Sequence, residues 1–157
     1  QEEENVAYDI SGKEAFKDLP VQMNPYDETN SEPNFWLSCL LIDKEAMCGQ
    51  VRGEKEVLYI SEPGKSCPTE ILDNIIKLNA EGRSIWKPMH MQPIYRMNPF
   101  ITPKGSGRAL SNAYIDGDEI YDAGADIFDR GLCLPSDNKM TTEQQNRIIE
   151  IIHSCFD

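Results

Sequence analysis

The stretch Arg83-Ser-Ile-Trp-Lys-Pro-Met-His-Met-Gln-Pro93 mixes apolar and reactive polar side chains more densely than any other part of the chain. Its first residues, Ser84 to Trp86, have the apolar and aromatic character of a short strand. Pro88 disfavours helix at the residue before it, and Pro93 closes the segment. We therefore expect a stiff, extended loop between the two prolines, which can hold a side chain at little ordering cost on binding.

This expected loop offers a cation, an imidazole, an amide and an indole, at Lys87, His90, Gln92 and Trp86. His90 is one of only two histidines in the chain. A purely structural interpretation is also open: Trp86, Met89 and Met91 would pack, and a lone histidine is more often part of the structure than of a site. Composition alone does not decide between the two interpretations.

The motif Arg83-x-x-Trp-Lys-Pro-Met-His-x-Gln-Pro93 closely resembles a segment of the DegT/DnrJ/StrS-type sugar aminotransferases. These enzymes use pyridoxal phosphate (PLP) and act on nucleotide-linked keto-sugars. Two further blocks resemble the same family in the same order, Asn34 to Asp43 and Phe128 to Ser136, the second followed by Thr142-Glu-Gln-Gln145. They look like the opening strand and the C-terminal strand and helix of the family's small domain. Family members more often have proline where this chain has Ser84.

The resemblance implies the C-terminal small domain of a fold-type-I aminotransferase. The parent enzyme would move an amino group from an amino acid, commonly glutamate, to a nucleotide keto-sugar, for cell-surface polysaccharide or a similar product. It would be a homodimer, with PLP held by a lysine of its large domain. Nothing here resembles that lysine's segment, so we expect no cofactor and no catalytic residue in this chain. The alternative is a non-catalytic binding module that retains the small-domain fold.

The resemblance assigns substrate binding to six residues, His90, Gln92, Lys87, Arg83, Trp86 and Met89. A diphosphate and an amino-acid carboxylate both require cations; arginine suits a carboxylate by its fork and lysine acts as a point charge. His90 would donate a hydrogen bond to a phosphate or a sugar hydroxyl. The structural alternative is that Arg83 pairs with a neighbouring carboxylate and His90 bonds backbone. In a small domain separated from its large domain, we also expect exposed apolar side chains at Met89, Met91, Ile94 and Tyr95.

Composition limits the class of protein. The 157 residues suit one domain with a real core. The net charge of −12 argues against nucleic acid and anionic membranes as partners. We find no run of apolar residues that approaches a membrane span. The five cysteines are odd in number and lack CxxC spacing, which indicates a reduced, cytoplasmic compartment.

The first 33 residues are strongly acidic. They hold nine acidic and two basic residues, so −7 of the net charge lies there. We interpret residues 1–33 as an acidic linker or a loosely docked arm, with loop over Val21 to Ser31. Residues 34–157 would form the small domain, with an insertion at 44–66.

The apolar pattern predicts an α+β fold: a small, mostly antiparallel sheet with helices packed on one face. We expect strands near 35–42, 83–87 and 131–134 in one sheet, and a further strand at 57–60 in the insertion. Helices are expected near 69–80, 118–129 and 141–155, the first stopped by Gly82 and the last opened by a capping box at Thr141 and Gln144. Asn98 to Asn112, rich in Pro, Gly and Ser, is expected to be loop.

Several partial motifs fail on their spacing. Gly64-Lys-Ser66 lacks the glycine that a phosphate-binding loop needs five positions earlier, where Tyr59 stands. Gly105-x-Gly107 lacks the third glycine of a dinucleotide fingerprint and follows no predicted strand. Two distant histidines without cysteine pairs argue against zinc, and the acidic run 116–129 lacks the ligand periodicity of a calcium loop.

Overall fold

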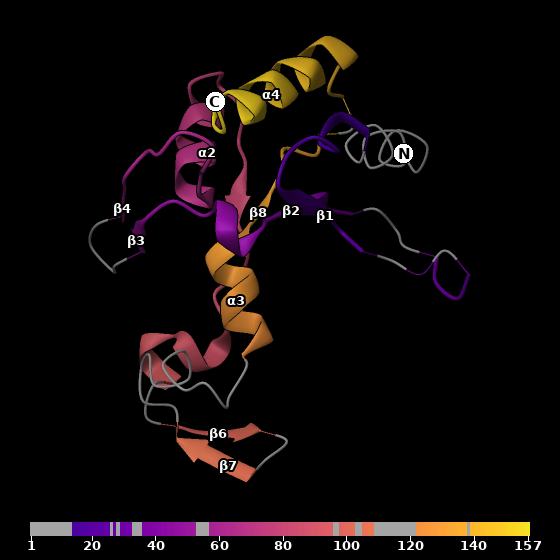
Figure 1. The fold of residues 1–157 in the computed structure, drawn as a ribbon. Helices are drawn as coiled ribbons and strands as arrows, with labels where there is room; N and C mark the ends of the chain where they lie inside the picture. Colours follow the sequence, from indigo (N-terminus) through magenta and orange to yellow (C-terminus); the bar gives the residue numbers. More distant parts are fainter. Residues whose placement is uncertain are drawn as a thin grey trace. The chain divides into compact units, whose positions relative to one another are not determined.

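The computed structural model describes residues 14–25, 27, 29–32, 36–52, 57–95, 98–102, 105–108, 122–137 and 139–157. The chain divides into two compact units. The first unit comprises Gln1–Ser84 and Arg130–Asp157, and the second comprises Ile85–Asp129. Figure 1 labels most of their helices and strands.

A four-stranded antiparallel sheet organises the first unit. Its order is β1-β2-β8-β5, from strands β1 (Val21–Met23), β2 (Cys39–Ile42), β8 (Gly131–Cys133) and β5 (Arg83–Ser84). The three strands expected to share a sheet do so, although β2 begins later and β5 ends earlier than the apolar pattern indicates. The small antiparallel sheet of the predicted α+β class is therefore confirmed.

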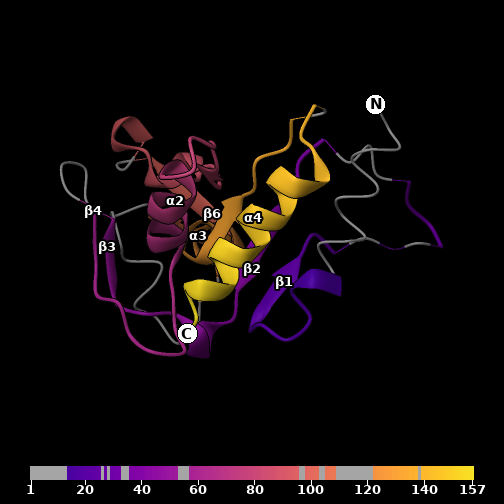
Figure 2. The ribbon, with the colours of Figure 1, turned by 90° about the horizontal axis from the view of Figure 1, so that it is seen from above.

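Helices α2 (Pro68–Ile76) and α4 (Thr142–Ser154) contact each other and pack on this sheet (Figure 2). Pro68 occupies the first turn of α2, where a missing N–H costs nothing. The predicted capping box opens α4: Thr141 Oγ1 accepts from the Gln144 N–H at 3.2 Å, and the Gln144 side chain accepts from the Thr141 N–H at 2.9 Å. Both helix starts agree with the prediction.

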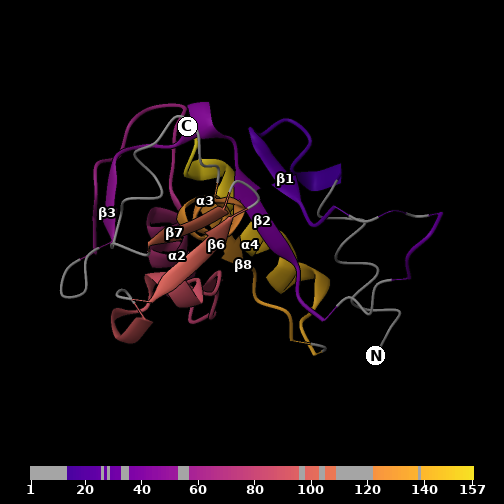
Figure 3. The ribbon, with the colours of Figure 1, turned by 90° about the horizontal axis from the view of Figure 1, so that it is seen from below.

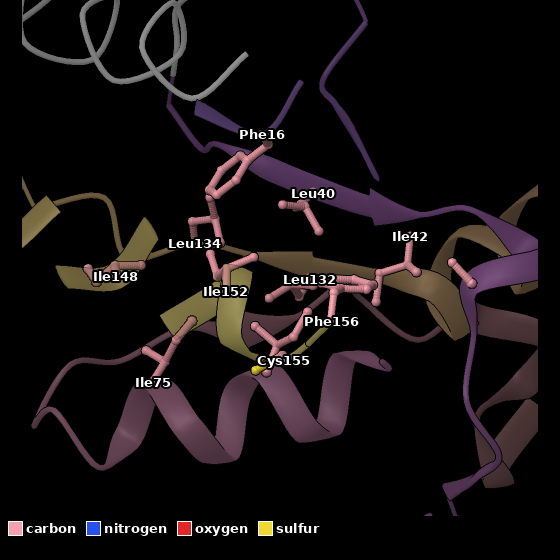
Figure 4. Close-up of a cluster of buried hydrophobic side chains, with 12 residues drawn as sticks. Phe16, Leu40, Ile42, Ile75, Leu132, Leu134, Ile148, Ile152, Cys155 and Phe156 are labelled. Atoms are coloured by element: carbon pink, nitrogen blue, oxygen red, sulfur yellow. The ribbon is translucent and has the colours of Figure 1, made fainter. Parts of the chain in front are cut away.

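The hydrophobic core lies between the sheet and these two helices (Figure 4). Alternation along β2 sends Leu40 and Ile42 into it, while Cys39 and Leu41 stay half-buried. The other strand and helix residues of the core are Leu132, Leu134, Ile71, Ile75, Ile148 and Ile152. The helical stripe and the strand alternation thus meet in one cluster, as binary patterning requires.

The N-terminal segment belongs to this unit, which corrects two expectations. The predicted loop from Val21 to Ser31 is wrong at its start, because β1 pairs with β2 in the register Val21↔Ile42 (Figure 3). Phe16 is 2% exposed in the core cluster, although the acidic composition around it indicated no core residue. The backbone carbonyl of Ala15 lies 2.8 Å from His153 Nε2 on α4. A few long-range contacts outweigh the local polarity.

Helix α2 ends earlier than predicted, and Gly82 has another role. The helix stops at Ile76, and the chain turns at Asn79, whose φ is 57°. A Cβ on Gly82 would lie 2.7 Å from Leu72 Cδ2 and 3.1 Å from the Cys133 carbonyl oxygen. Gly82 therefore permits a close approach of two backbone segments and does not terminate the helix.

The predicted insertion contains η1 (Lys44–Ala46) and an antiparallel pair, β3 (Gln50–Arg52) and β4 (Val57–Tyr59). Strand β4 confirms the strand expected there. The segment is joined to α2 by a buried carboxylate: Glu70 accepts hydrogen bonds from Ser61 Oγ at 2.5 Å and Ser66 Oγ at 3.0 Å. These hydroxyls offset the cost of burying the charge.

The second unit contains 3-10 helices η2 (Met89–Met91) and η3 (Pro93–Tyr95), strands β6 (Pro99–Thr102) and β7 (Gly105–Arg108), and α3 (Ala123–Arg130), whose last residue falls in the first unit. The loop predicted over Asn98 to Asn112 is wrong where β6 and β7 pair, with Phe100 opposite Gly107. The backbone hydrogen bonds between these two strands outweigh the low strand propensity of their glycines. The predicted start of α3, at residue 118, lies outside the described residues.

No helix in the described parts of the chain combines the length and the apolar character that crossing a bilayer requires.

Candidate functional site

The motif loop of the second unit is folded into two tight turns, not extended. The Met91 N–H donates to the Pro88 carbonyl and the Tyr95 N–H to the Gln92 carbonyl, both at 3.0 Å. Pro88 itself stays extended, with ψ of 147°. The prediction was wrong because each proline precedes or begins a turn, where no N–H is needed from it. The fixed φ angles of the two prolines therefore stabilise a compact loop instead of an extended one.

Gln92 holds this loop closed. Its Nε2 donates to the Lys87 backbone carbonyl at 3.1 Å, across five residues. The amide of Gln92 therefore has a structural partner within the motif. Lys87 itself is half-buried.

His90 lies against a carboxylate that the sequence analysis did not select. Its Nε2 is 2.5 Å from Oδ2 of Asp122, and the two side chains are only 12% and 6% exposed. The other carboxylate oxygen, Oδ1, accepts from the Ala125 N–H at 3.0 Å. Asp122 thus caps the first turn of α3 while it contacts His90. The available signal was an aspartate just before an apolar helical stripe, a typical N-cap position.

Arg83 belongs to the other unit, on β5. Its Nη2 lies 2.6 Å from Glu81 Oε1, and both side chains are mostly exposed. This is the neighbouring carboxylate of the structural alternative. An exposed ion pair of this kind contributes little to stability, so the partner can be exchanged at low cost.

The apolar side chains of the motif are largely uncovered. Trp86, Met89 and Ile94 are exposed, whereas Met91 and Tyr95 are half-buried. The expected exposure is therefore confirmed for Met89 and Ile94 and is partial for Met91 and Tyr95. Together these residues give the second unit an apolar surface next to its polar groups.

No family model matches the chain. A relative from Bacillus subtilis (strain 168), named as a pyridoxal phosphate-dependent aminotransferase (EpsN), is 32% identical over 89 residues, which cover 57% of this chain and 19% of the relative. The solved structures of the aminotransferase TlmJ from Streptoalloteichus hindustanus and of a DegT DnrJ EryC1 StrS aminotransferase from Brucella abortus each match 98% of this chain with a TM-score of 0.60, at 9% and 14% identity. The chain therefore shares the fold of part of these solved aminotransferases. It spans 31% of the length of each of these two solved structures.

The described lysines of this chain do not have the setting that PLP requires. A lysine that forms a Schiff base works from a desolvated pocket or beside another cation. The described lysines are all exposed or half-buried, and Lys17, Lys65 and Lys77 have Glu14, Glu62 and Asn74 as polar partners. The described lysines therefore do not fit the Schiff-base role that PLP requires. Across the same residues, no group of three His, Cys, Asp or Glu side chains is arranged to hold a metal ion.

Proposed function

We propose that the chain is the small domain of a PLP-dependent aminotransferase that transfers an amino group to a nucleotide-linked keto-sugar. Support comes from the PLP-dependent relative, the aminotransferase fold and the motif Arg83 to Pro93. The product would be an amino sugar for a cell-surface polysaccharide or a similar polymer, made in the cytoplasm by a homodimer. PLP and the amino-acid donor would be bound with the large domain of the same protein.

The observation that carries the proposal is the arrangement around His90. His90 Nε2 lies 2.5 Å from the Asp122 carboxylate, both side chains are buried or nearly so, and Gln92 closes the loop, so the imidazole lies in a packed setting before substrate arrives. A pre-oriented donor loses little entropy on binding. In the proposal, His90 bonds a phosphate or a sugar hydroxyl, and Lys87 supplies positive charge to the diphosphate.

The remaining motif residues have roles suited to their exposure. Trp86 and Met89 provide an apolar surface on which a nucleotide base or a sugar ring can pack. Arg83, whose partner Glu81 is exposed, would exchange that carboxylate for one on the substrate. Gln92 acts through the loop, because its amide holds the Lys87 carbonyl.

The experiment compares His90→Ala with His153→Ala in the full-length enzyme. His153 is the matched control, because it is the other of the chain's two histidines and lies on α4 against the Ala15 carbonyl. Loss of a hydrogen bond to a charged group costs about 1.5–3 kcal/mol. His90→Ala should therefore lower kcat/KM for the sugar by roughly 10- to 100-fold, with unchanged PLP absorbance. Unchanged kinetics with the sugar substrate in His90→Ala would show that His90 does not bind it.

A second measurement addresses inactivity of this chain alone. The isolated 157 residues, incubated with PLP and borohydride, should show no stoichiometric label on any one lysine. Label on a single lysine would contradict the proposal. A full-length protein that binds nucleotide-sugar but never transaminates would instead support the non-catalytic module.

A further inference from the structure

Two cysteines face each other across neighbouring strands of the first unit. Cys39 on β2 is directly opposite Cys133 on β8, and their sulfur atoms are 3.7 Å apart. At the next position, the Leu134 N–H donates to the Ser38 carbonyl at 2.9 Å. Hydrogen-bonded and non-hydrogen-bonded pairs alternate in an antiparallel ladder. Cys39 and Cys133 therefore form a non-hydrogen-bonded pair.

This register suits a disulfide. The Cα atoms of a non-hydrogen-bonded pair are about 4.5 Å apart, which falls within the range of roughly 4.4–6.8 Å that disulfides span. The two sulfur atoms must approach to about 2 Å, a change that side-chain rotation supplies without moving either strand. All five cysteines are free thiols, so the pair is reduced in this structure.

The two thiols differ in access and acidity. Cys39 is half-buried, whereas the other four cysteines are buried. A hydrogen bond from the Cys133 thiol, helped by Asn24, lowers the pKa of Cys39 to about 7 against the opposing effect of burial. The hydrogen bond to Cys39 and burial raise the pKa of Cys133. At neutral pH, Cys39 is thus the more reactive nucleophile and Cys133 the thiol held beside it.

We propose that Cys39 and Cys133 form a reversible dithiol–disulfide site whose oxidant is a hydroperoxide such as hydrogen peroxide. With hydrogen peroxide, the Cys39 thiolate attacks one peroxide oxygen and the O–O bond breaks. The departing hydroxide takes up the proton that the Cys39 thiol released to solvent, so one water leaves as the sulfenic acid forms. The Cys133 sulfur then attacks the Cys39 sulfur. The S–S bond forms, and the sulfenic oxygen leaves with the Cys133 proton as a second water. Two thiols lose two electrons and the peroxide gains them.

The site lies beside the motif strand. Cys133 is paired on its other side with Arg83 of β5, so Cys39, Cys133 and Arg83 lie in one row across three strands. Oxidation would join β2 to β8 covalently at this row. The chemistry does not depend on the proposed transaminase activity.

The test treats the wild-type protein with hydrogen peroxide, blocks the remaining thiols with iodoacetamide and maps peptides without reduction. We expect alkylatable thiols to fall from five to three, with Cys39 linked to Cys133 and the link reversed by dithiothreitol. A link between the buried Cys48 and Cys67, or five thiols retained, would overturn the proposal. This experiment uses only the wild-type protein, so its result does not depend on the folding of a variant.

Two variants then test the order of events. Cys133→Ser should stop at the sulfenic acid, captured on Cys39 by dimedone, and Cys39→Ser should give neither adduct nor link. Cys155→Ser is the matched control, a buried thiol of the core cluster, and should form the link as wild type does. A dimedone adduct on Cys133 in Cys39→Ser would refute the assigned roles.

Discussion

Asp122 uses its two carboxylate oxygens for two different partners: Oδ2 lies 2.5 Å from His90 Nε2, and Oδ1 accepts from the Ala125 N–H at 3.0 Å. One side chain therefore connects the motif loop to the first turn of α3. The close approach places a carboxylate beside the imidazole of the motif. Asp122 itself lies outside the motif from Arg83 to Pro93.

Variants of Asp122 should separate these two contacts. Asp122→Ala removes both, and loss of the cap should cost about 1 kcal/mol of unfolding free energy. Asp122→Asn keeps a cap of similar strength but replaces the carboxylate at His90 with an amide. In the full-length enzyme we expect Asp122→Asn to raise the sugar KM several-fold with nearly wild-type stability. If Asp122→Asn has the wild-type KM for the sugar, Asp122 acts only as a helix cap.

Gly82→Ala should destabilise the first unit. The added Cβ would meet the flexible Leu72 side chain at 2.7 Å and the Cys133 backbone oxygen at 3.1 Å. Overpacking of this kind costs roughly 1–3 kcal/mol, measurable by urea unfolding. Gly49→Ala is the matched control, because nothing lies within 4 Å of its Cβ position. Equal midpoints for the two variants would show that the strands separate easily at Gly82.

Phe16→Ala tests whether the N-terminal segment is part of the core. Phe16 is 2% exposed, and its ring centroid lies 6.2 Å from that of His153. Truncation of a buried phenylalanine costs about 3–5 kcal/mol, so the unfolding midpoint should fall sharply. Lys17→Ala, at the exposed neighbouring position, should change stability by less than about 0.5 kcal/mol. A small change in the unfolding midpoint of Phe16→Ala would instead favour the interpretation of this segment as a loosely docked arm.

The reactivity of Cys39 should follow its lowered pKa. Since the thiolate is the nucleophile, the rate of alkylation at Cys39 should rise with pH and level off above a midpoint near 7. Cys133→Ala removes the hydrogen bond that is the main cause of the shift, so its midpoint should move towards the ordinary value of 9.0. Mass spectrometry after timed iodoacetamide pulses measures both. A midpoint near 9 in the wild type would contradict the hydrogen bond.

The sequence alone determined the features that depend on neighbours along the chain. Short apolar runs predicted β2 and β8, and the stripe and capping box predicted α4 and its first residue. The motif from Arg83 to Pro93 indicated the resemblance to aminotransferases. These signals are readable because strand alternation, helical spacing and caps are local effects, set within a few residues.

The tertiary structure decided the features that depend on residues far apart in sequence. Phe16 joins the core and β1 joins the sheet despite an acidic surrounding, because burial against α4 and pairing with β2 supply contacts that composition does not record. Asp122 meets His90 across 32 positions, and Cys39 meets Cys133 across 94. Such pairs depend on register and chain path, and no local pattern contains either.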